Sequence, residues 1–327
     1  MMRAAVLGCG LIGAKRAKAA NNIRVVSFCD VDAARAEALA RMMPGAEAST
    51  DWRATVRRED IDLVFVATTH DMLAPIAAEA AAHGKHVLVE KPGARCKLEL
   101  APVREAAERT GALVRVGFNH RYHRAFQKAR ELFDAGALGE MMFVRARYGH
   151  GGRPGYDREW RAAPEKSGGG ELVDQGVHLI DLARWFLGDF REVRAFIGTF
   201  FWDMPVEDNA FLLLRTAAGQ VASLHATWTE WKNLFSFEIY GRHAKLEISG
   251  LGGSYGTERL AFYRLLPDMG PPETTIWEYP ATDDSWERET AEFLEDIRLG
   301  RKPSPGIVDA EAALDIVETV YQERIHS

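Results

Sequence analysis

The residues best suited to acid–base chemistry in this chain are a carboxylate and an imidazole four positions apart, Asp174 and His178. They follow Gly168-Gly169-Gly170, in a segment (171–187) whose composition predicts a largely apolar helix. Residues at i and i+4 share one helix face, so the carboxylate can fix the imidazole tautomer and raise its basicity. Such an imidazole can take a proton from a substrate hydroxyl near neutral pH. The alternative is a solvated helix face or a histidine satisfied in the core.

A second group of residues has the spacing of a dinucleotide-binding loop. Gly8, Gly10 and Gly13 follow a short apolar run and open an Ala- and Lys-rich segment, and a second apolar run ends at Asp30. In the strand–loop–helix that this pattern predicts, Gly8 allows the tight turn and Gly10 lets a pyrophosphate approach the backbone, while Gly13 lets helix and strand pack closely. The helix N-terminus offers free N–H groups and a positive dipole to the phosphates.

The position of Asp30 bears on the choice of cofactor. It stands 17 residues after Gly13, close to the spacing of about 20 expected for an acid that binds the ribose 2′-hydroxyl. A carboxylate there repels a 2′-phosphate, so NAD is favoured over NADP, although Arg35 and Arg41 could soften that preference. The alternative is an ordinary glycine turn in an α/β protein that binds no nucleotide.

The rest of the first third alternates between buried-type strands and helices. Strands are expected at 23–29, 61–67, 87–89 and 113–117, and helices at 72–83 and 99–109. The alternation predicts an α/β fold with a parallel, doubly wound Rossmann sheet, whose ligands bind beyond the carboxyl ends of the strands. That rule selects residues that directly follow a strand: Thr68, Thr69, His70, Glu90, Lys91 and Asn119.

Beyond residue 119 the pattern changes to short β-rich runs with few helices. Strands are expected at 141–148, 193–201, 210–216, 221–228 and 235–240, and helices at 126–135, 171–187, 286–299 and 309–324. These runs predict a C-terminal α+β domain with a large, mostly antiparallel sheet. We therefore expect a Rossmann domain over residues 1–120 and a second domain over residues 121–327.

Composition and charge exclude several classes of protein. With 327 residues, 41 Lys plus Arg and 47 Asp plus Glu, the chain has a net charge of −6, which argues against a general nucleic-acid binder. No uncharged apolar run approaches the roughly 18 residues of a membrane span. Three cysteines without a CxxC pair argue against a disulfide scaffold or a zinc ribbon. We expect a cytoplasmic protein with no membrane partner.

Three motifs together closely resemble those of the glucose–fructose oxidoreductase/inositol dehydrogenase (Gfo/Idh/MocA) family. They are the glycine loop with Asp30, the run Glu90-Lys91-Pro92, and the run from Gly168 to His178. The resemblance covers nearly the whole chain and extends to residues 117–122 and to Trp160-Arg161.

One turn departs from the family pattern. Thr69 stands where proline is usual, His70 where asparagine is usual, and Leu73 where a histidine is usual. This departure concerns the detailed contacts after the strand at 61–67, not the fold.

The resemblance implies an NAD-dependent oxidoreductase that moves a hydride between nicotinamide C4 and a secondary alcohol of a sugar, nucleotide-sugar or cyclitol. It implies that the second domain binds the substrate and that its open sheet forms the interface of a homodimer or homotetramer. In the implied reaction Lys91 binds the substrate hydroxyl and assists its proton transfer, His178 is the general acid/base, and Asp174 orients the substrate or the histidine.

The expected site residues fall into two sets. The expected cofactor contacts are Gly8, Gly10, Leu11, Ile12, Gly13, Asp30, Thr68, Thr69, His70, Glu90, Lys91 and Asn119. The expected substrate contacts are Lys91, His120, Arg121, Trp160, Arg161, Asp174 and His178. No metal is expected, because His120 and His123 lack a third ligand nearby.

A cluster of arginines bears on the substrate class. Arg153, Arg158 and Arg161 could meet an anionic group such as a uronate carboxylate or a nucleotide-sugar phosphate. Alternatively, they pair with the acids nearby in sequence, which are Asp157, Glu159 and Glu165.

Two further function classes fit the same motifs. One is a redox-neutral enzyme that uses transient oxidation for glycoside cleavage or epimerisation, and net NADH production would separate it from a dehydrogenase. The other is a non-catalytic NAD-binding sensor, against which the intact set of Lys91, Asp174 and His178 argues.

Overall fold

The computed structural model describes residues 1–325, which fold as two compact units. The first contains Met1–Phe118, Glu165–Gly168 and Trp286–Asp315, and the second contains Asn119–Pro164, Gly169–Ser285 and the described chain from residue 316 onward. These units differ from the expected division at residue 120, because residues 286–315 join the first unit.

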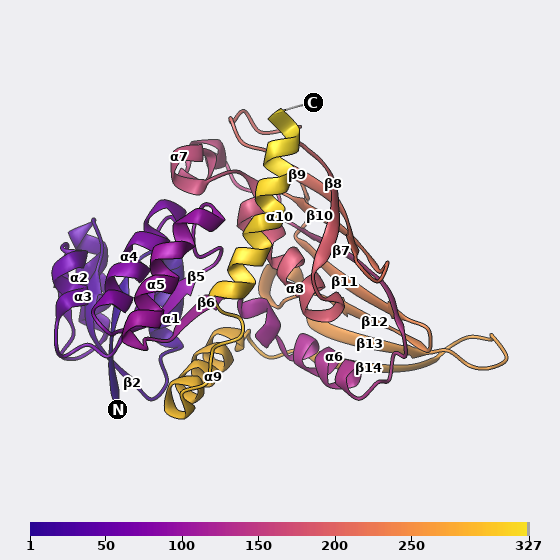
Figure 1. Ribbon diagram of the computed structural model, residues 1–327, viewed down its shortest axis with the longest axis horizontal. Helices are drawn as coiled ribbons and strands as arrows, with labels where there is room; N and C mark the ends of the chain where they lie inside the picture. Colours follow the sequence, from indigo (N-terminus) through magenta and orange to yellow (C-terminus); the bar gives the residue numbers. More distant parts are fainter. Residues whose placement is uncertain (326–327) are drawn as a thin grey trace. The chain divides into compact units, whose positions relative to one another are not determined.

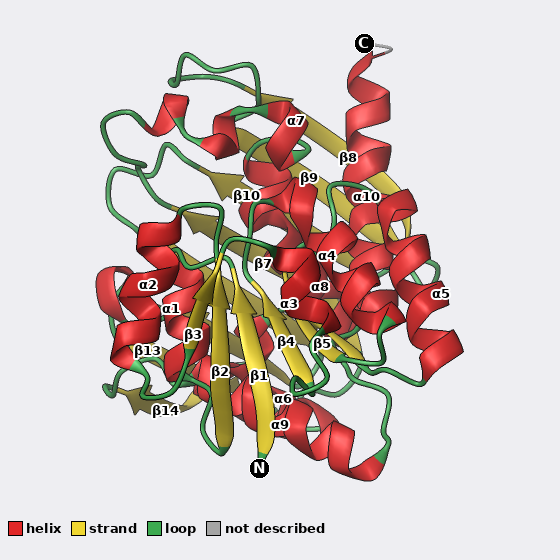
Figure 2. Ribbon diagram, turned by 90° about the vertical axis from the view of Figure 1, so that its left-hand side faces the viewer, coloured by secondary structure: helices red, strands yellow, loops and turns green. Residues whose placement is uncertain are grey.

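The first unit is built on a parallel sheet of six strands in the order β3-β2-β1-β4-β5-β6. Figure 2 shows the arrowheads of its labelled strands at one edge, where the connecting loops meet. This confirms the expected doubly wound sheet, and β4 is buried at every position, as a strand covered on both faces must be. The strands are β1 Met2–Leu7, β2 Ile23–Cys29, β3 Glu47–Ser49, β4 Leu63–Val66, β5 His86–Glu90 and β6 Val114–Gly117.

Helices flank this sheet. They are α1 Leu11–Lys18, α2 Ala33–Met42, α3 Trp52–Arg57, α4 His70–Ala82 and α5 Ala101–Thr110, together with α9 Ser285–Leu299 and the start of α10, Ile307–Ile325. Two buried ion pairs explain why α9 belongs to this unit: Glu289 meets Arg16 of α1, and Asp296 meets Arg115 of β6. A buried ion left without its partner would be costly, so these contacts hold α9 in place.

The second unit is built on an eight-stranded sheet in the order β14-β13-β12-β11-β7-β10-β9-β8. Neighbouring strands are antiparallel except β7 and β10, which are parallel, so the expected mostly antiparallel sheet is confirmed. The strands are β7 Met141–Gly149, β8 Phe190–Gly198, β9 Asn209–Thr216, β10 Val221–Thr227, β11 Leu234–Gly241, β12 Ala244–Ser249, β13 Glu258–Arg264 and β14 Glu273–Tyr279.

Strand β8 lies three residues earlier than the strand expected at 193–201. The carboxylate of Asp208 accepts hydrogen bonds from the backbone N–H groups of Phe200, Phe201 and Trp202. These three amides are therefore bound in a loop and cannot continue the sheet ladder.

Helices α6, Arg124–Asp134, and α8, Val177–Leu187, lie on one face of this sheet (Figure 1). A short helix, α7, covers Pro164–Ser167. The single helix expected over 171–187 is divided into a π-helical turn, Leu172–Gly176, and α8. The expectation that Asp174 and His178 are related by regular α-helical spacing was therefore wrong, because the wider turn ends between them.

No helix in the described part of the chain is both long enough and apolar enough to cross a membrane.

Candidate functional site

In the glycine loop between β1 and α1, only one of the three glycines has open space where a side chain would begin. A Cβ on Gly8, whose φ is +90°, would lie 2.3 Å from the Ala67 carbonyl oxygen, and one on Gly13 would lie 1.8 Å from the Gly8 carbonyl oxygen. A Cβ on Gly10 would meet nothing within 4 Å. The loop thus packs tightly at its ends and exposes backbone at its centre, which fits the approach of a pyrophosphate.

The first turn of α1 can receive an anion. Its N-cap is Gly10, which has no side chain to cap the helix, and the turn contains no acidic residue. The N–H groups of Leu11, Ile12 and Gly13, which open the helix, therefore have no intrahelical acceptor. Together with the helix dipole they favour a phosphate at this end, as expected for these residues.

Asp30 is held next to the glycine loop by two backbone hydrogen bonds. Its Oδ2 accepts from the N–H of Cys9 at 2.7 Å, and its Oδ1 accepts from the N–H of Asp32 at 2.9 Å. Burial, and then the negative charge of Asp30, raise the pKa of the Cys9 thiol to about 12. The thiol is therefore neutral, and the carboxylate supplies the charge that can accept ribose hydroxyl protons.

Three of the expected cofactor residues form the turn after β4, at the same edge as the glycine loop. The Thr69 hydroxyl donates to Asp71 at 2.5 Å, and the Thr68 hydroxyl donates to the Thr69 carbonyl at 3.2 Å. The buried His70 has its Nδ1 2.8 Å from the Ser167 carbonyl oxygen. These bonds hold the turn itself in shape, so its backbone is presented at the sheet edge.

Glu90, at the end of β5, serves the interior of the first unit. Its carboxylate lies 2.6 Å from Nε of Arg16, and Nη1 of the same fully buried guanidinium lies 2.6 Å from Glu289. Burial raises the pKa of Glu289, although Arg16 opposes this. The carboxylate of Glu90, expected at the cofactor, is thus used to hold Arg16, while the half-buried Lys91 follows directly after the strand.

In the second unit, Asp174 is paired with Arg161. Nε of Arg161 lies 2.8 Å from Oδ2 of the buried Asp174, and its guanidinium lies 4.5 Å from the centre of the Trp160 ring. Burial tends to lower the pKa of Arg161, but Asp174 outweighs it and the pKa is raised. The structure therefore brings three of the expected substrate residues together as an ion pair with an aromatic neighbour.

The other two arginines near this segment pair locally. Arg153 lies 2.7 Å from Glu159, and Arg158 lies 3.8 Å from Asp157. For these two, the structure favours the alternative of local pairing over a shared anion site.

His178 stacks on a second histidine. Its ring and that of His120 are 3.8 Å apart between centroids and inclined by 19°, and both side chains are buried. Tyr148 lies edge-on to both rings. Burial, followed by Tyr255, raises the pKa of Tyr148 well above its ordinary value, so this phenol stays neutral. The imidazoles are then the side chains of this cluster whose ordinary titration lies near neutral pH.

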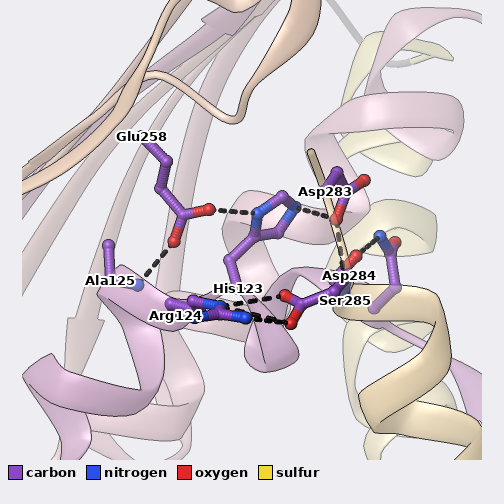
Figure 3. Close-up of polar contacts among 8 residues, drawn as sticks. His123, Arg124, Ala125, Glu258, Asp283, Asp284 and Ser285 are labelled. Atoms are coloured by element: carbon purple, nitrogen blue, oxygen red, sulfur yellow. Dashed lines mark hydrogen bonds and ion pairs between the residues drawn. The ribbon is translucent and has the colours of Figure 1, made fainter. Parts of the chain in front are cut away.

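Three residues at the start of the second unit use their side chains for contacts with other elements of that unit. Arg121, expected at the substrate, forms a buried pair with Asp181 in which Nε lies 2.8 Å from Oδ2. The amide of Asn119, expected at the cofactor, donates to Ser285 at 2.9 Å. The ring of His123 lies between Glu258 and Asp283 (Figure 3).

No cluster of metal-ligating side chains occurs in the described residues.

Sequence reasoning missed Glu207. This buried carboxylate accepts hydrogen bonds from the N–H groups of Gly170 and Leu172, both at 3.1 Å, and from the Tyr321 hydroxyl at 2.8 Å. It anchors the start of the π-helical turn that carries Asp174. Two adjacent acids, Glu207 and Asp208, lie one residue before the strand predicted at 210–216, and this pair is a signal that could have identified it.

Comparison with known proteins agrees with this geometry. Residues 2–118 match a model described as an oxidoreductase family with an NAD-binding Rossmann fold, and residues 126–247 match a GFO/IDH/MocA C-terminal domain. A levoglucosan dehydrogenase from Pseudarthrobacter phenanthrenivorans is 28% identical over 85% of this chain and 83% of its own. The scyllo-inositol 2-dehydrogenase (NAD(+)) of Bacillus subtilis is 26% identical over 96% of this chain and 92% of its own.

A solved levoglucosan dehydrogenase, in complex with NADH and levoglucosan, superposes with a TM-score of 0.87 at 26% identity, covering 98% of this chain and 97% of the other. Both units thus match the two domains of one family. The chain belongs to the GFO/IDH/MocA family of NAD-binding oxidoreductases.

Proposed function

We propose that this protein is an NAD-dependent dehydrogenase that oxidises a secondary alcohol of a sugar, nucleotide-sugar or cyclitol. The observation that carries the proposal is the buried imidazole of His178, which lies beside the neutral phenol of Tyr148, in a chain whose first unit builds a dinucleotide-binding loop. The names of the relatives, levoglucosan and scyllo-inositol dehydrogenases, support this substrate class.

The first unit supplies the residues proposed to hold NAD. The backbone at Gly10 and the first turn of α1 would bind the pyrophosphate, and Asp30 would accept hydrogen bonds from the adenosine ribose. The turn of Thr68, Thr69 and His70 would contact the cofactor through its backbone. NAD, when bound, supplies a nicotinamide ring that accepts the hydride of the carbinol carbon.

The carbinol can lose that hydride only if its hydroxyl group loses a proton. We assign a nitrogen of the His178 ring as the acceptor of this proton. Lys91 would bind the same hydroxyl, because an ammonium stabilises the negative charge that develops on the oxygen. Asp174, held by Arg161 at 2.8 Å, would orient the substrate with a carboxylate of fixed position. Of these residues, Lys91 belongs to the first unit, and His178, Asp174 and Arg161 belong to the second.

We propose in addition that copies of this chain associate through the eight-stranded sheet as a homodimer or homotetramer. Large apolar side chains are exposed on its strands: Phe196 of β8 is 83% exposed, and Phe211 and Leu213 of β9 are 42% and 56% exposed. Phe196 and Phe211 are cross-strand partners, so they form one continuous apolar surface. Exposed patches of this kind are typical of association surfaces.

A substrate screen tests the proposed activity. We expect NADH to form when the protein is mixed with NAD and one class among inositols, free sugars, uronates and nucleotide-sugars. His178→Ala should lower the rate by about a hundredfold or more, within the range of general-base contributions. His243→Ala, which changes an exposed histidine of the same unit, is the matched control and should keep the parent rate. Equal rates for the parent and His178→Ala would overturn the assignment of the base.

A further inference from the structure

The ring of His120, expected at the substrate, has no role in the proton transfer proposed above, yet it lies against the proposed base. The imidazoles of His120 and His178 overlap face to face at 3.8 Å, and both side chains are 4–5% exposed. His120 belongs to a short 3-10 turn, Asn119–Tyr122, and His178 to the first turn of α8. Elements nearly 60 residues apart thus bring two titratable rings into contact.

Aromatic edges enclose this stack. Tyr148 of β7 lies 5.2 Å from the His120 ring centre at 61°, and Phe235 of β11 lies 5.8 Å away at 80°. Tyr148 also lies 6.3 Å from His178 at 66°. Rings packed edge-on from two strands leave the His120 ring little freedom to rotate. The His178 ring lies face to face with this enclosed ring.

The charges around the stack come from several elements. The His123 ring lies 5.6 Å from that of His120, and its nitrogens lie 2.9 Å from Glu258 and 3.9 Å from Asp283 (Figure 3). Beyond Tyr148, the ionisable groups of the π-helical segment are Glu171 and Asp174, and both act electrostatically on that phenol.

A further phenol, Tyr255, belongs to the same surroundings. Burial, and then Glu171, raise its pKa to about 12. Both phenols are therefore neutral near pH 7, whereas the two stacked rings are imidazoles, whose ordinary titration lies near that pH.

We propose that His120 is a positioning residue for proton transfer at His178: its stacked ring fixes the plane of the His178 imidazole and limits the pair to one proton. This inference rests on the proposed function for the role of His178 as base. When His178 takes the hydroxyl proton, a neutral His120 presents its π face to the new imidazolium, which is favourable. A second proton would place two cations 3.8 Å apart in a buried site, which is unfavourable.

The proton count of the pair follows from this arrangement. One N–H bond forms on His178 as the substrate O–H bond breaks, and the same proton later leaves His178 for solvent. His120 gains no proton during the cycle. Because the two sites interact strongly, they titrate as a unit with separated steps.

Histidine NMR titration tests the coupling without substrate or cofactor. His120→Phe and His178→Phe keep a ring in the stack and leave one titratable imidazole each. We expect each remaining imidazole to bind one proton in a single step, and the parent pair to bind one proton over that same range. The second step of the parent should be displaced by at least about one pH unit. Two full protons in the parent, at the midpoints of the single variants, would overturn the inference.

Steady-state kinetics test the positioning. His120→Ala should lower kcat by roughly tenfold or more, because misplaced groups lose rate steeply. His120→Phe should recover most of that loss, and NADH affinity should stay unchanged in both variants. An unchanged kcat in His120→Ala, or no recovery in His120→Phe, would contradict positioning by the ring. A coupled titration in a protein that forms no NADH with any substrate would overturn the proposed function alone, because the titration needs no turnover.

Discussion

Removal of the charge at Asp30 should change the cofactor preference of this protein. Its carboxylate is fixed by the N–H groups of Cys9 and Asp32 at 2.7 and 2.9 Å, so it cannot swing away from a ribose bound next to the glycine loop. Asp30→Asn keeps the size of the side chain and removes its charge. The variant should bind NADH more weakly and should bind NADPH relatively better.

The size of the effect follows from the type of bond that is lost. A hydrogen bond to a charged group contributes about 1.5–3 kcal/mol. Since about 1.4 kcal/mol corresponds to a factor of ten, the Kd for NADH should rise by roughly 10- to 150-fold. The repulsion between the carboxylate and a 2′-phosphate disappears in the same variant. The Kd for NADPH divided by the Kd for NADH should therefore fall by a larger factor than the rise in the NADH Kd alone would give.

Fluorescence titration with NADH and NADPH measures both constants. Asp32→Asn is the matched control, because Asp32 carries the same charge two residues away, and its Oδ1 caps α2 through the N–H of Ala34 at 3.0 Å. Asparagine caps a helix about as well as aspartate, so this control should keep both its stability and its cofactor preference. A ratio that is unchanged in Asp30→Asn, or that changes equally in Asp32→Asn, would refute the reading of the ribose by Asp30.

Three other changes test separate parts of the account. Lys91→Ala should reduce kcat by at least about a hundredfold and leave the NADH Kd nearly unchanged; retained turnover would refute its role at the hydroxyl. Burial raises the pKa of Glu207 above its ordinary 4.5, so its titration stabilises the fold below that pH, and this contribution is lost as pH rises through the raised pKa. Urea unfolding should therefore show the parent losing stability relative to Glu207→Gln as pH rises from about 4 to 8, and a constant difference would contradict this. Arg16→Met should cost about 3–5 kcal/mol in the same assay because it leaves two carboxylates buried, whereas the exposed control Arg41→Met should cost under about 1 kcal/mol; equal losses would argue against the buried pair.

The sequence predicts the part of the first unit whose pattern is periodic. The strand expected at 23–29 is β2, and the glycine loop and Asp30 lie where the fingerprint places them. The sequence pattern predicts no element over residues 31–60, although they form α2, β3 and α3. Only Ala36 of α2 is buried, so this helix has almost no apolar stripe to detect.

The second unit shows a similar limit. Strand β14 is exposed or half-buried throughout, as an edge strand at one end of the sheet, so it gives no apolar alternation. Strand β12 does alternate in burial, so its sequence carries a detectable strand pattern, although no strand is predicted there. The π-helical turn could not be predicted, because helical composition does not distinguish a wide turn from a regular one.

The types of the residues predict the candidate chemistry better than they predict which residues are in contact. Asp174, His178 and Arg161 were selected as site residues, and the structure pairs the first with the third. Arg121 was expected at the substrate, yet it meets Asp181, which is 60 residues away in sequence. This pair forms where α8 packs against the 3-10 turn at Asn119–Tyr122, and no local sequence pattern encodes such a long-range contact.

Transfer of isotope from substrate to cofactor tests the central claim most directly. The substrate found in the screen would be prepared with deuterium on the carbinol carbon and incubated with NAD, and the NADH and the sugar product would be analysed by mass spectrometry. A dehydrogenase would place one deuterium on NADH for each ketone formed, and the label would be absent from the product. A sugar product that retains or exchanges its deuterium, with no net NADH, would contradict a dehydrogenase and show a redox-neutral reaction.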